Sequence, residues 1–547
     1  MSHCFSRPKV FLALLSGALL GLAYPPVPVG ITAFFAFIPF FFLFDEIESY
    51  GEAFRYSYIM LFVFNLMTVY WTGGFTHLKD PYLIAAGALL IVAHPLFFFV
   101  AIGPWIFIRR QFGFKTSLFA FPFLWVAYEY FRAHTEFSFP WLTLGNTQTY
   151  DLSAIQFASI TGAYGISFWI LWLNVLLFTL AVKIALKEWN PTSARSVLTA
   201  SFIVLLYMAP KLYGSYVLST AQTVSSNQIR LGVVQPNIDP FEKWERHADP
   251  QLDLLQRLTD SLATKNVDLI IWPETAVPFY ILSPSHRPSL ERIKEQVDRL
   301  HIPLLTGIPD IEYYPDTDDV PRSSKTSSSG QRYDTFNSSM LLTPGSAEIQ
   351  KYAKMILVPF AERVPYSEGL SFLNAVQWNF GLGGWNVGRE QSVFSFRTGK
   401  GTDVKFSNMI CYESVYPGFV ASFVRNGAQF LTVITNDSWW GNTSGAYQHK
   451  QIATLRAVEN RRWVVQCANG GISCYIDPWG RIIEASTMYT QRVLAQEVGL
   501  EDELTYYTMH GDWFAEVCGV LTLLILGGGI GKKFYGTIRM RQLHEPH

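Results

Sequence analysis

Eight long apolar runs constrain what this chain can fold into more than any other feature. They cover residues 10–23, 31–44, 58–71, 83–108, 118–131, 166–185, 197–208 and 513–530. A helix needs about 20 mostly apolar residues to cross a bilayer, and about 17 can suffice. A soluble core would not need so many successive runs, so we expect a multi-pass α-helical membrane domain with about eight spans.

Basic residues in the short connections orient these spans. They are Arg7, Lys9, Arg109, Arg110, Lys115, Lys183, Lys187, Arg195, Lys532, Lys533, Arg539 and Arg541. With eight spans, all of them fall on one side of the membrane, and lysine and arginine favour the cytoplasmic side. We therefore expect a seven-span domain over residues 1–212, an extracytoplasmic domain over 213–511, a last span at 512–531 and a basic cytoplasmic tail at 532–547. Both termini are then cytoplasmic.

Charge and cysteine content exclude several classes of protein. Charged residues make up only 16% of the chain and the net charge is -1, so nothing indicates a nucleic-acid partner. Cys4 and Cys518 lie in or beside apolar runs, which leaves an odd set of three cysteines in the large domain and at least one free thiol. Cys467 and Cys474 either form a disulfide or lie as thiols on neighbouring strands. The pattern "VVQCANGGISCYI" favours the second alternative, because it predicts strand, turn and strand.

Between the membrane segments, short apolar strands alternate with amphipathic helices. Strands are predicted at "IRLGVVQPNI", "VDLIIWPE", "IPLLTGIPD", "SSMLLTP", "KMILVPF", "DVKFSNMICYE" and "QFLTVITND", and helices over 247–263, over 289–300 and from Pro417. Continuous apolar strands separated by helices indicate an α/β domain whose sheets are buried on both faces. Residues 313–331, rich in Ser, Asp and Pro, predict a surface insertion.

Three strand ends carry polar residues that a core does not need, namely Glu274, Lys354 and Cys411. Reactive groups in open α/β sheets gather at the carboxyl ends of strands. Glu274 and Cys411 directly follow their strands. Lys354 stands near the start of its apolar run, so its strand must run the other way or the lysine must reach across. Each residue alone also has a structural explanation: a helix cap, a snorkelling lysine or a small buried thiol.

Taken together, the three residues predict covalent catalysis. A thiol becomes a strong nucleophile as a thiolate, which a nearby base and a nearby cation promote. The carboxylate can take the thiol proton and return it to a leaving group, and the ammonium can stabilise the oxyanion of a tetrahedral intermediate. No Cys/His cluster has the spacing of metal ligands, and the histidine in "QHK" at 448–450 stands alone, so we expect neither a metal nor a cofactor.

The motifs "WPETAVP", "KMILVPFAE" and "ICYESVYP", in this order, resemble the Glu–Lys–Cys triad of the nitrilase superfamily. With apolar runs before and after them, the chain resembles the apolipoprotein N-acyltransferase family of bacterial inner membranes. The stretches "VVQPNIDPFEKW", "TNDSWWGNTSGAYQHK" and "FSFPWLTLGNTQ" also resemble that family, whereas Gln466 and Gly470 depart from its usual arginine and asparagine. The resemblance implies that the large domain is an αββα sandwich.

The resemblance also implies roles for individual residues. Cys411 is the nucleophile, Glu274 the general base and Lys354 the group that stabilises thiolate and oxyanion. Supporting roles fall to Glu362, Tyr412 and Glu413, and a substrate contact to Trp244. The sequence itself offers Trp378, Trp385 and Trp439 as further candidates for substrate contacts. Trp439, in "NDSWW", either lines an acyl pocket or packs in an aromatic core. Trp378 and Trp385 lie in the glycine-rich stretch 372–388, which is either a packed loop or a lid at the membrane interface.

The implied reaction is a ping-pong acyl transfer. Cys411 takes a fatty acyl chain from a phospholipid, phosphatidylethanolamine at sn-1, and passes it to the α-amino group of the N-terminal diacylglyceryl-cysteine of an apolipoprotein. The implied partners are phospholipid, apolipoproteins and the bilayer of the inner membrane, with the catalytic domain on the periplasmic face, and a monomer suffices. The alternatives are a membrane-tethered amidase or nitrilase that uses water as acceptor, and a non-catalytic lipid-binding protein.

Glu129 and Arg132 are ionisable residues in or beside the fifth apolar run, where charges are costly. One interpretation is a pair that satisfies itself at i,i+3 spacing. The other is a role in binding a lipid headgroup or in positioning the large domain.

Overall fold

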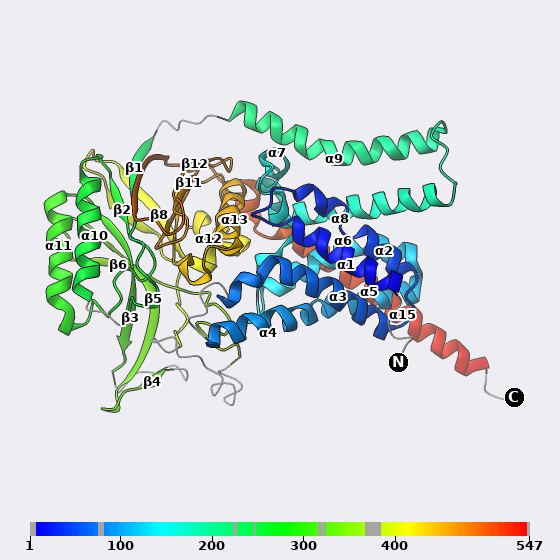
Figure 1. The fold of residues 1–547 in the computed structure, drawn as a ribbon, viewed down its shortest axis with the longest axis horizontal. Coiled ribbons are helices and arrows are strands. Elements are labelled where there is room, and N and C mark those ends of the chain that lie inside the picture. The colour runs from blue at the N-terminus through cyan, green and yellow to red at the C-terminus, as the bar shows by residue number, and fades with distance from the viewer. Residues whose placement is uncertain are drawn as a thin grey trace.

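The computed structural model describes residues 7–74, 81–221, 227–244, 248–315, 320, 324–366 and 384–543. A bundle of helices and a domain with two β-sheets lie side by side (Figure 1). We call them the helical part and the two-sheet part.

The helical part holds all eight apolar runs. Its elements are α1 (Arg7–Leu22), η1 (Gly30–Phe34), α2 (Ile38–Asp45), α3 (Tyr50–Val69), η2 (Tyr70–Gly73), α4 (Pro81–Phe97), α5 (Phe99–Phe112), α6 (Phe114–Ala133), η3 (Pro140–Leu142), η4 (Leu144–Gln148), α7 (Leu152–Ile155), α8 (Ala158–Ala185), α9 (Ala194–Thr220) and α15 (Trp513–Leu543). α9 and α15 continue beyond residues 212 and 531, where the seventh and eighth spans were expected to end.

Four helical segments among the described residues are long and apolar enough to cross a membrane. They are Leu83–Phe112, Ala158–Ala185, Ala194–Thr220 and Trp513–Arg539. Two more apolar helices, Pro8–Leu22 and Gly30–Asp45, are shorter. The count of eight spans stays a prediction.

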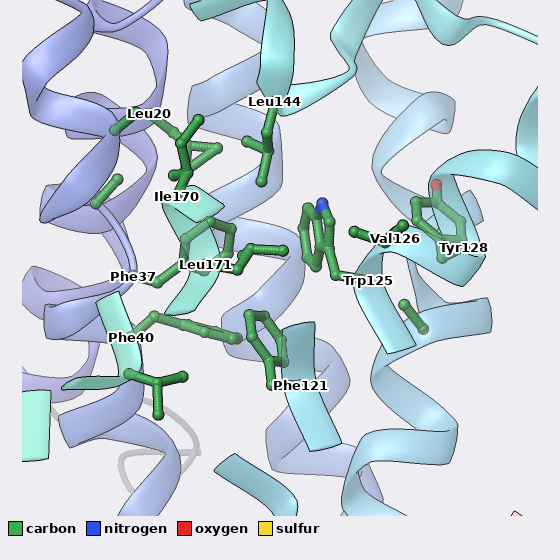
Figure 2. Close-up of a cluster of buried hydrophobic side chains, with 14 of the residues drawn as sticks. Leu20, Phe37, Phe40, Phe121, Trp125, Val126, Tyr128, Leu144, Ile170 and Leu171 are labelled. Atoms are coloured by element: carbon green, nitrogen blue, oxygen red, sulfur yellow. The ribbon is translucent and has the colours of Figure 1, made fainter. Parts of the chain in front are cut away.

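Aromatic side chains fill the centre of the helical part. Figure 2 shows Phe37, Phe121 and Trp125 pointing toward one another, and the ring centroid of Phe37 lies 5.4 Å from that of Phe121 and 5.0 Å from that of Trp125. The chain is not regular helix here, because η1 and α2 are separated by a break. Asn174 of α8 satisfies that break: its amide donates to Ala33 O at 2.8 Å and its carbonyl accepts from Phe37 N at 2.9 Å. Where water is absent, a backbone group freed by a broken helix needs such a partner.

The two-sheet part contains β1 (Gln228–Gln235), β2 (Leu269–Ile271), β3 (Leu304–Tyr313), β4 (Lys325–Thr326), β5 (Arg332–Leu342), β6 (Ile349–Ala353), β7 (Phe394–Arg397), β8 (Asp403–Ile410), β9 (Phe430–Thr435), β10 (Val464–Ala468), β11 (Cys474–Ile476), β12 (Ile482–Ala485) and β13 (Arg492–Gly499). One sheet has the order β13-β1-β2-β3-β5-β4, with β6 also paired to β5, and the other has the order β12-β11-β10-β9-β8-β7.

Helices cover the outer faces of both sheets (Figure 1). α10 (Ala248–Ala263) and α11 (Arg287–Leu300) lie on the first sheet, and α12 (Pro417–Arg425), α13 (Ser444–Asn460) and α14 (Tyr506–His510) lie between the second sheet and the helical part. Between the sheets, Val233 and Ile271 of one pack in a common apolar core with Met409 and Val433 of the other. The layers therefore follow the order helix, sheet, sheet, helix.

The strand predicted at "KMILVPF" is wrong. β6 covers Ile349–Ala353 instead, and the residues after it are irregular. The run is apolar because Ile356 and Val358 pack against Trp71 and Tyr412 where the two parts meet, not because it lies in a sheet. Since β6 is antiparallel to β5 and β5 to β3, β6 runs parallel to β3, and Lys354 follows the carboxyl end of its strand.

Cys467 and Cys474 are free thiols on the neighbouring strands β10 and β11, as the strand–turn–strand pattern predicted. Of the predicted insertion at 313–331, the described portion includes β4, which pairs with β5.

Helix α13 joins the two parts, and nearly all of it is buried. Gln448 accepts hydrogen bonds from the indoles of Trp71 (3.0 Å) and Trp141 (2.7 Å) and donates to Thr68 O at 3.0 Å. Glu459, near the other end of the helix, accepts from Ala163 N at 2.8 Å, where α8 is interrupted. These buried contacts fix how the two-sheet part sits on the helices.

Candidate active site

A cavity at the junction of the two parts brings together the residues singled out from the motifs. Glu274, Lys354 and Cys411 all line it. Further lining comes from Glu362, Asn337 and the tryptophans Trp244, Trp385, Trp439 and Trp440, and from Leu83 at the start of α4. The helical part thus contributes a side chain to the wall of the cavity.

Lys354 is held between two carboxylates. Its Nζ lies 2.8 Å from Glu362 Oε1 and 3.6 Å from Glu274 Oε1, and its side chain is only 1% exposed. Burial alone lowers the pKa of Lys354, but the Glu362 and Glu274 carboxylates outweigh it and raise the pKa. The ammonium therefore stays charged.

Asn337, in the middle of β5, completes this arrangement. Its amide donates to Glu274 Oε1 at 2.8 Å and to Glu362 Oε1 at 3.2 Å. Buried carboxylates need such partners. The motifs did not indicate Asn337, although a polar residue within the apolar strand "TFNSSMLL" is a signal that could have done so.

The electrostatics of the cavity suit a base and a protonated thiol. Burial raises the pKa of Glu274, Lys354 lowers it and Glu362 raises it, with a net upward shift. Burial likewise raises the pKa of Cys411, the Glu274 carboxylate raises it further and Lys354 opposes both. The resting thiol is therefore protonated, and a base of raised pKa stands beside it, as general base catalysis near neutral pH requires.

Cys411 directly follows β8 and begins a short 3-10 turn, Cys411–Val415. Its φ of +53° lies in the left-handed region. For a residue other than glycine, such a conformation costs about 1–3 kcal/mol and persists only where the surroundings hold it. The turn exposes the thiol side of the residue to the cavity.

Glu413 connects the cysteine segment to the lysine segment. Its fully buried carboxylate accepts from Ile410 N at 2.8 Å, from Met355 N at 2.7 Å and from the Tyr352 hydroxyl at 2.6 Å. Burial raises the pKa of Glu413 to about 7, against the effect of these hydrogen bonds. One carboxylate therefore fixes Ile410, which precedes Cys411, and Met355, which follows Lys354.

Tyr412 points away from the cavity toward the helical part. Its hydroxyl donates to Ser138 O at 2.8 Å, and its ring stacks with that of Trp141. The residue next to the nucleophile thus contacts the segment that follows α6.

Lys243 is a second buried lysine beside Glu274, and it stands in the motif "VVQPNIDPFEKW", from which only Trp244 was predicted to act. Its Nζ donates to Glu274 O at 3.1 Å and to Thr275 Oγ1 at 2.8 Å. Thr275 has a φ of +44°, so this lysine holds a strained turn at the end of β2. Burial lowers the pKa of Lys243 to about 7, although Glu274 opposes that shift.

The predicted lid, residues 372–388, lies largely outside the described residues, and so does Trp378. Trp385, at its far end, lines the cavity and donates its backbone N–H to Glu362 O at 3.1 Å. Within the described ranges, no group of three His, Cys, Asp or Glu residues is placed to hold a metal ion.

Glu129 and Arg132 bind different partners, so the interpretation as a self-satisfying pair is wrong. Glu129 Oε1 accepts from Leu144 N at 2.9 Å, at the start of η4, and from the Trp125 indole. Arg132 Nη2 lies 2.9 Å from His94 Nε2. A spacing of three residues allowed a pair, but neighbouring elements offered better partners to each side chain.

Comparisons with known proteins agree with this architecture. Residues 16–176 match the apolipoprotein N-acyltransferase N-terminal domain and residues 230–503 match the carbon-nitrogen hydrolase domain. The structural alignment with Saccharomyces cerevisiae Nit3, a nitrilase superfamily member, spans 53% of this chain and 96% of Nit3. The sequence identity is 17% and the TM-score is 0.37.

Three relatives in bacteria carry the name apolipoprotein N-acyltransferase. That of Chlorobaculum tepidum is 37% identical, over 97% of this chain and 98% of its own. The relative in Geobacter metallireducens is 32% identical over 94% of this chain and 93% of its own length. The relative in Pseudomonas aeruginosa is 32% identical over 79% of this chain and 78% of its own length. The family indicated by the triad motifs is thereby confirmed, and the chain belongs to the apolipoprotein N-acyltransferase family.

Proposed function

We propose that this protein transfers a fatty acyl chain from a phospholipid, through a thioester on Cys411, to the α-amino group of the N-terminal diacylglyceryl-cysteine of an apolipoprotein. The observation that carries the proposal is the cavity, which gathers Cys411, Glu274 and Lys354 and is walled by Leu83 of the helical part. A soluble amide would need no such wall, which weighs against the amidase alternative.

In the first step, Glu274 takes the Cys411 proton and the thiolate attacks the ester carbonyl of the phospholipid. The charge that develops on the carbonyl oxygen is stabilised by the Lys354 ammonium, because a buried cation interacts strongly in a site from which water is excluded. The carbon–oxygen bond of the ester then breaks. Glu274 returns the proton to the departing lysophospholipid, and the acyl chain stays on sulfur.

In the second step, the free amine of the apolipoprotein attacks the thioester. Glu274 takes a proton from the attacking nitrogen, the amide forms, and the Cys411 thiolate leaves and is reprotonated. The two half-reactions share one cavity, so the first product must leave before the second substrate enters. This order corresponds to a ping-pong mechanism.

Glu362, Asn337 and Glu413 support the triad through the contacts described above, and we assign the tryptophans Trp244, Trp378, Trp385 and Trp439 to substrate contacts. Indole side chains are large and amphipathic, which suits the boundary between an acyl chain and a polar headgroup. We assign residues 372–388 to a lid over this boundary.

We further propose eight spans in a bacterial inner membrane, with the catalytic domain periplasmic, both termini cytoplasmic and the monomer active. Two contacts support this orientation. Lys9 Nζ lies 3.6 Å from Glu52 Oε1, and Lys532 Nζ donates to the backbone oxygen of Gln111, the residue that follows Arg110. Basic residues from three separate connections thus gather at one end of the bundle. In intact spheroplasts and in a Cys411→Ala background, an impermeant thiol reagent should label Lys400→Cys but not Glu188→Cys, and the reverse would overturn the orientation.

The mass of the intact protein after incubation with phosphatidylethanolamine tests the reaction, with Cys411→Ala beside it. We expect a fatty-acyl increment on the wild type only, which a diacylglyceryl-cysteine peptide removes while becoming N-acylated. Loss of the increment without N-acylation would support the hydrolase. Absence of any increment with phospholipids would overturn the proposal.

A further inference from the structure

A chain of buried hydrogen bonds lies directly behind the nucleophile, on the side away from the cavity. The Ser414 hydroxyl donates to Cys411 O at 2.8 Å and lies 2.8 Å from His449 Nε2. His449 Nδ1 lies 3.0 Å from Asp437 Oδ1, and both side chains are 0% exposed. The histidine of "QHK", isolated in the sequence, thus reaches the residue that carries the reactive thiol.

The acceptors in this chain show how it is linked. A carbonyl and a carboxylate only accept, so the Ser414 hydroxyl donates to Cys411 O and His449 Nδ1 donates to Asp437. His449 Nε2 closes the chain on the Ser414 hydroxyl.

Asp437 depends on this histidine. Its Oδ1 accepts a second hydrogen bond from the Thr435 hydroxyl at 2.7 Å, whereas its Oδ2 is buried and finds no hydrogen-bond partner within the described part of the chain. A buried carboxylate is costly unless a charge compensates it. Asp437 also raises the pKa of Cys411, so an uncompensated Asp437 would oppose the thiolate that catalysis requires.

We propose that His449 and Asp437 are positioning residues that hold Cys411 in its left-handed conformation by fixing the Ser414 hydroxyl on the Cys411 carbonyl. Ile410 N, just before the cysteine, is held by Glu413, and the carbonyl of the cysteine by Ser414, so the strained residue is clamped on both sides. Without the second clamp, Cys411 can relax and turn its thiol away from Glu274 and Lys354. The inference rests on the proposed function, since it assigns Cys411 as the nucleophile.

The order serine, histidine, aspartate is the order of a hydrolytic triad, but this chain does not act as one. Ser414 is fully buried, its hydrogen is bound to a carbonyl, and Ser414, His449 and Asp437 do not line the cavity. They contact neither the substrate space nor the reacting atoms. Apart from the charge of Asp437, which raises the pKa of Cys411, their effect passes through the backbone of Cys411.

Two substitutions of one residue separate positioning from simple stability. The terminal amide of His449→Gln can reach the place of Nε2 and still donate to Ser414, whereas His449→Asn reaches only the place of Nδ1. Both variants remove the buried imidazole, so both should melt at lower temperatures than the wild type. Only His449→Asn releases Ser414.

The readout is the rate of acyl-enzyme formation by the full-length protein in detergent with phosphatidylethanolamine, measured by intact mass at increasing lipid concentrations. A displacement of about 1 Å can cost about 100-fold in rate, so we expect His449→Asn to fall about 100-fold below His449→Gln in the limiting rate. The lipid concentration at half-maximal rate should stay the same, because neither residue lines the cavity.

Alkylation of Cys411 by iodoacetamide provides a readout without lipid. We expect alkylation to be slower in His449→Asn than in His449→Gln, as for acyl-enzyme formation. The positioning role can therefore be judged even if the wild type forms no acyl-enzyme and the proposed function fails. Equal rates in His449→Asn and His449→Gln, whether both normal or both lost, would overturn the positioning role.

Discussion

The helical part and the two-sheet part both bury polar side chains but give them different partners. In the helical part, Asn174 and Glu129 bind backbone groups where helices start or break. In the two-sheet part, Lys354, Glu274 and Glu362 bind one another at the edge of a cavity. The sheet ladders satisfy most of the backbone there, so the charges of that cluster mainly satisfy one another, although Glu362 Oε2 also accepts from Val358 N at 2.7 Å.

The difference gives a rule for separating structural from functional polar residues in this fold. A buried side chain that replaces a missing backbone partner is explained by the fold alone. A buried cluster of charges that mainly satisfy one another is costly. It therefore points to chemistry.

Replacing Lys354 by methionine should abolish acyl-enzyme formation, with a loss of at least about 1,000-fold, because it removes the charge at the oxyanion and leaves two buried carboxylates facing each other. Single-turnover mass spectrometry measures the loss. The control is Lys351→Met in β6, the strand that Lys354 follows, which breaks only a half-exposed ion pair with Asp310 and should stay near wild type. Equal activity in Lys354→Met and Lys351→Met would mean that the buried charge cluster matters no more than a surface ion pair, and it would contradict the rule that such a cluster points to chemistry.

Glu413→Gln should reduce the rate by about 100-fold, because an amide cannot accept all the N–H groups that position Lys354 and Cys411. It should also change how stability depends on pH. The pKa of Glu413 is raised by burial from 4.5 to about 7, so between these values the folded state holds a proton that the unfolded state has released. The carboxyl therefore costs stability as pH rises from about 4.5 to 7.

The melting temperature of Glu413→Gln relative to wild type should consequently be lowest near pH 5 and rise toward pH 7.5. The exposed carboxyl of Glu390 provides the control, since Glu390→Gln should track the wild type in both rate and melting temperature at every pH. A difference between Glu413→Gln and wild type that does not vary with pH would contradict the assigned shift.

Gln448→Leu should lower the melting temperature more than it lowers activity. It leaves the indole N–H of Trp141 without its acceptor and removes one of the two acceptors of the Trp71 indole, which still donates to Thr68 O at 2.9 Å. A buried unsatisfied group costs about 1–3 kcal/mol. Differential scanning fluorimetry in detergent checks the shift, with Lys450→Met on the same helix as control. A loss of activity without a loss of stability would show that α13 acts on the chemistry through this residue as well.

The grouping of Glu274, Lys354 and Cys411 was predictable because each stands beside an apolar run in a distinctive motif. The motifs also indicated Glu362, Tyr412 and Glu413. They did not indicate roles for Asn337, Lys243 and His449, which come from separate elements and approach these residues only in the folded protein. The prediction of a strand over 354–360 was wrong for a related reason. Apolar residues that pack against another domain produce the same pattern as residues of a buried strand.

Glu129→Gln should have the smallest effect, although Glu129 is a carboxyl group buried among the helices. The amide oxygen of glutamine can still accept from Leu144 N and from the Trp125 indole, the contacts that the structure assigns to Oε1. We expect acyl transfer within about threefold of wild type, whereas Glu129→Ala should destabilise the protein by about 1–3 kcal/mol by leaving those donors unpaired. Acyl transfer and melting temperature in the same detergent check both variants. A large loss of transfer in a well-folded Glu129→Gln would mean that its charge is needed. The rule that separates the helical part from the two-sheet part would then fail at this residue, and the lipid headgroup role considered for Glu129 would gain support.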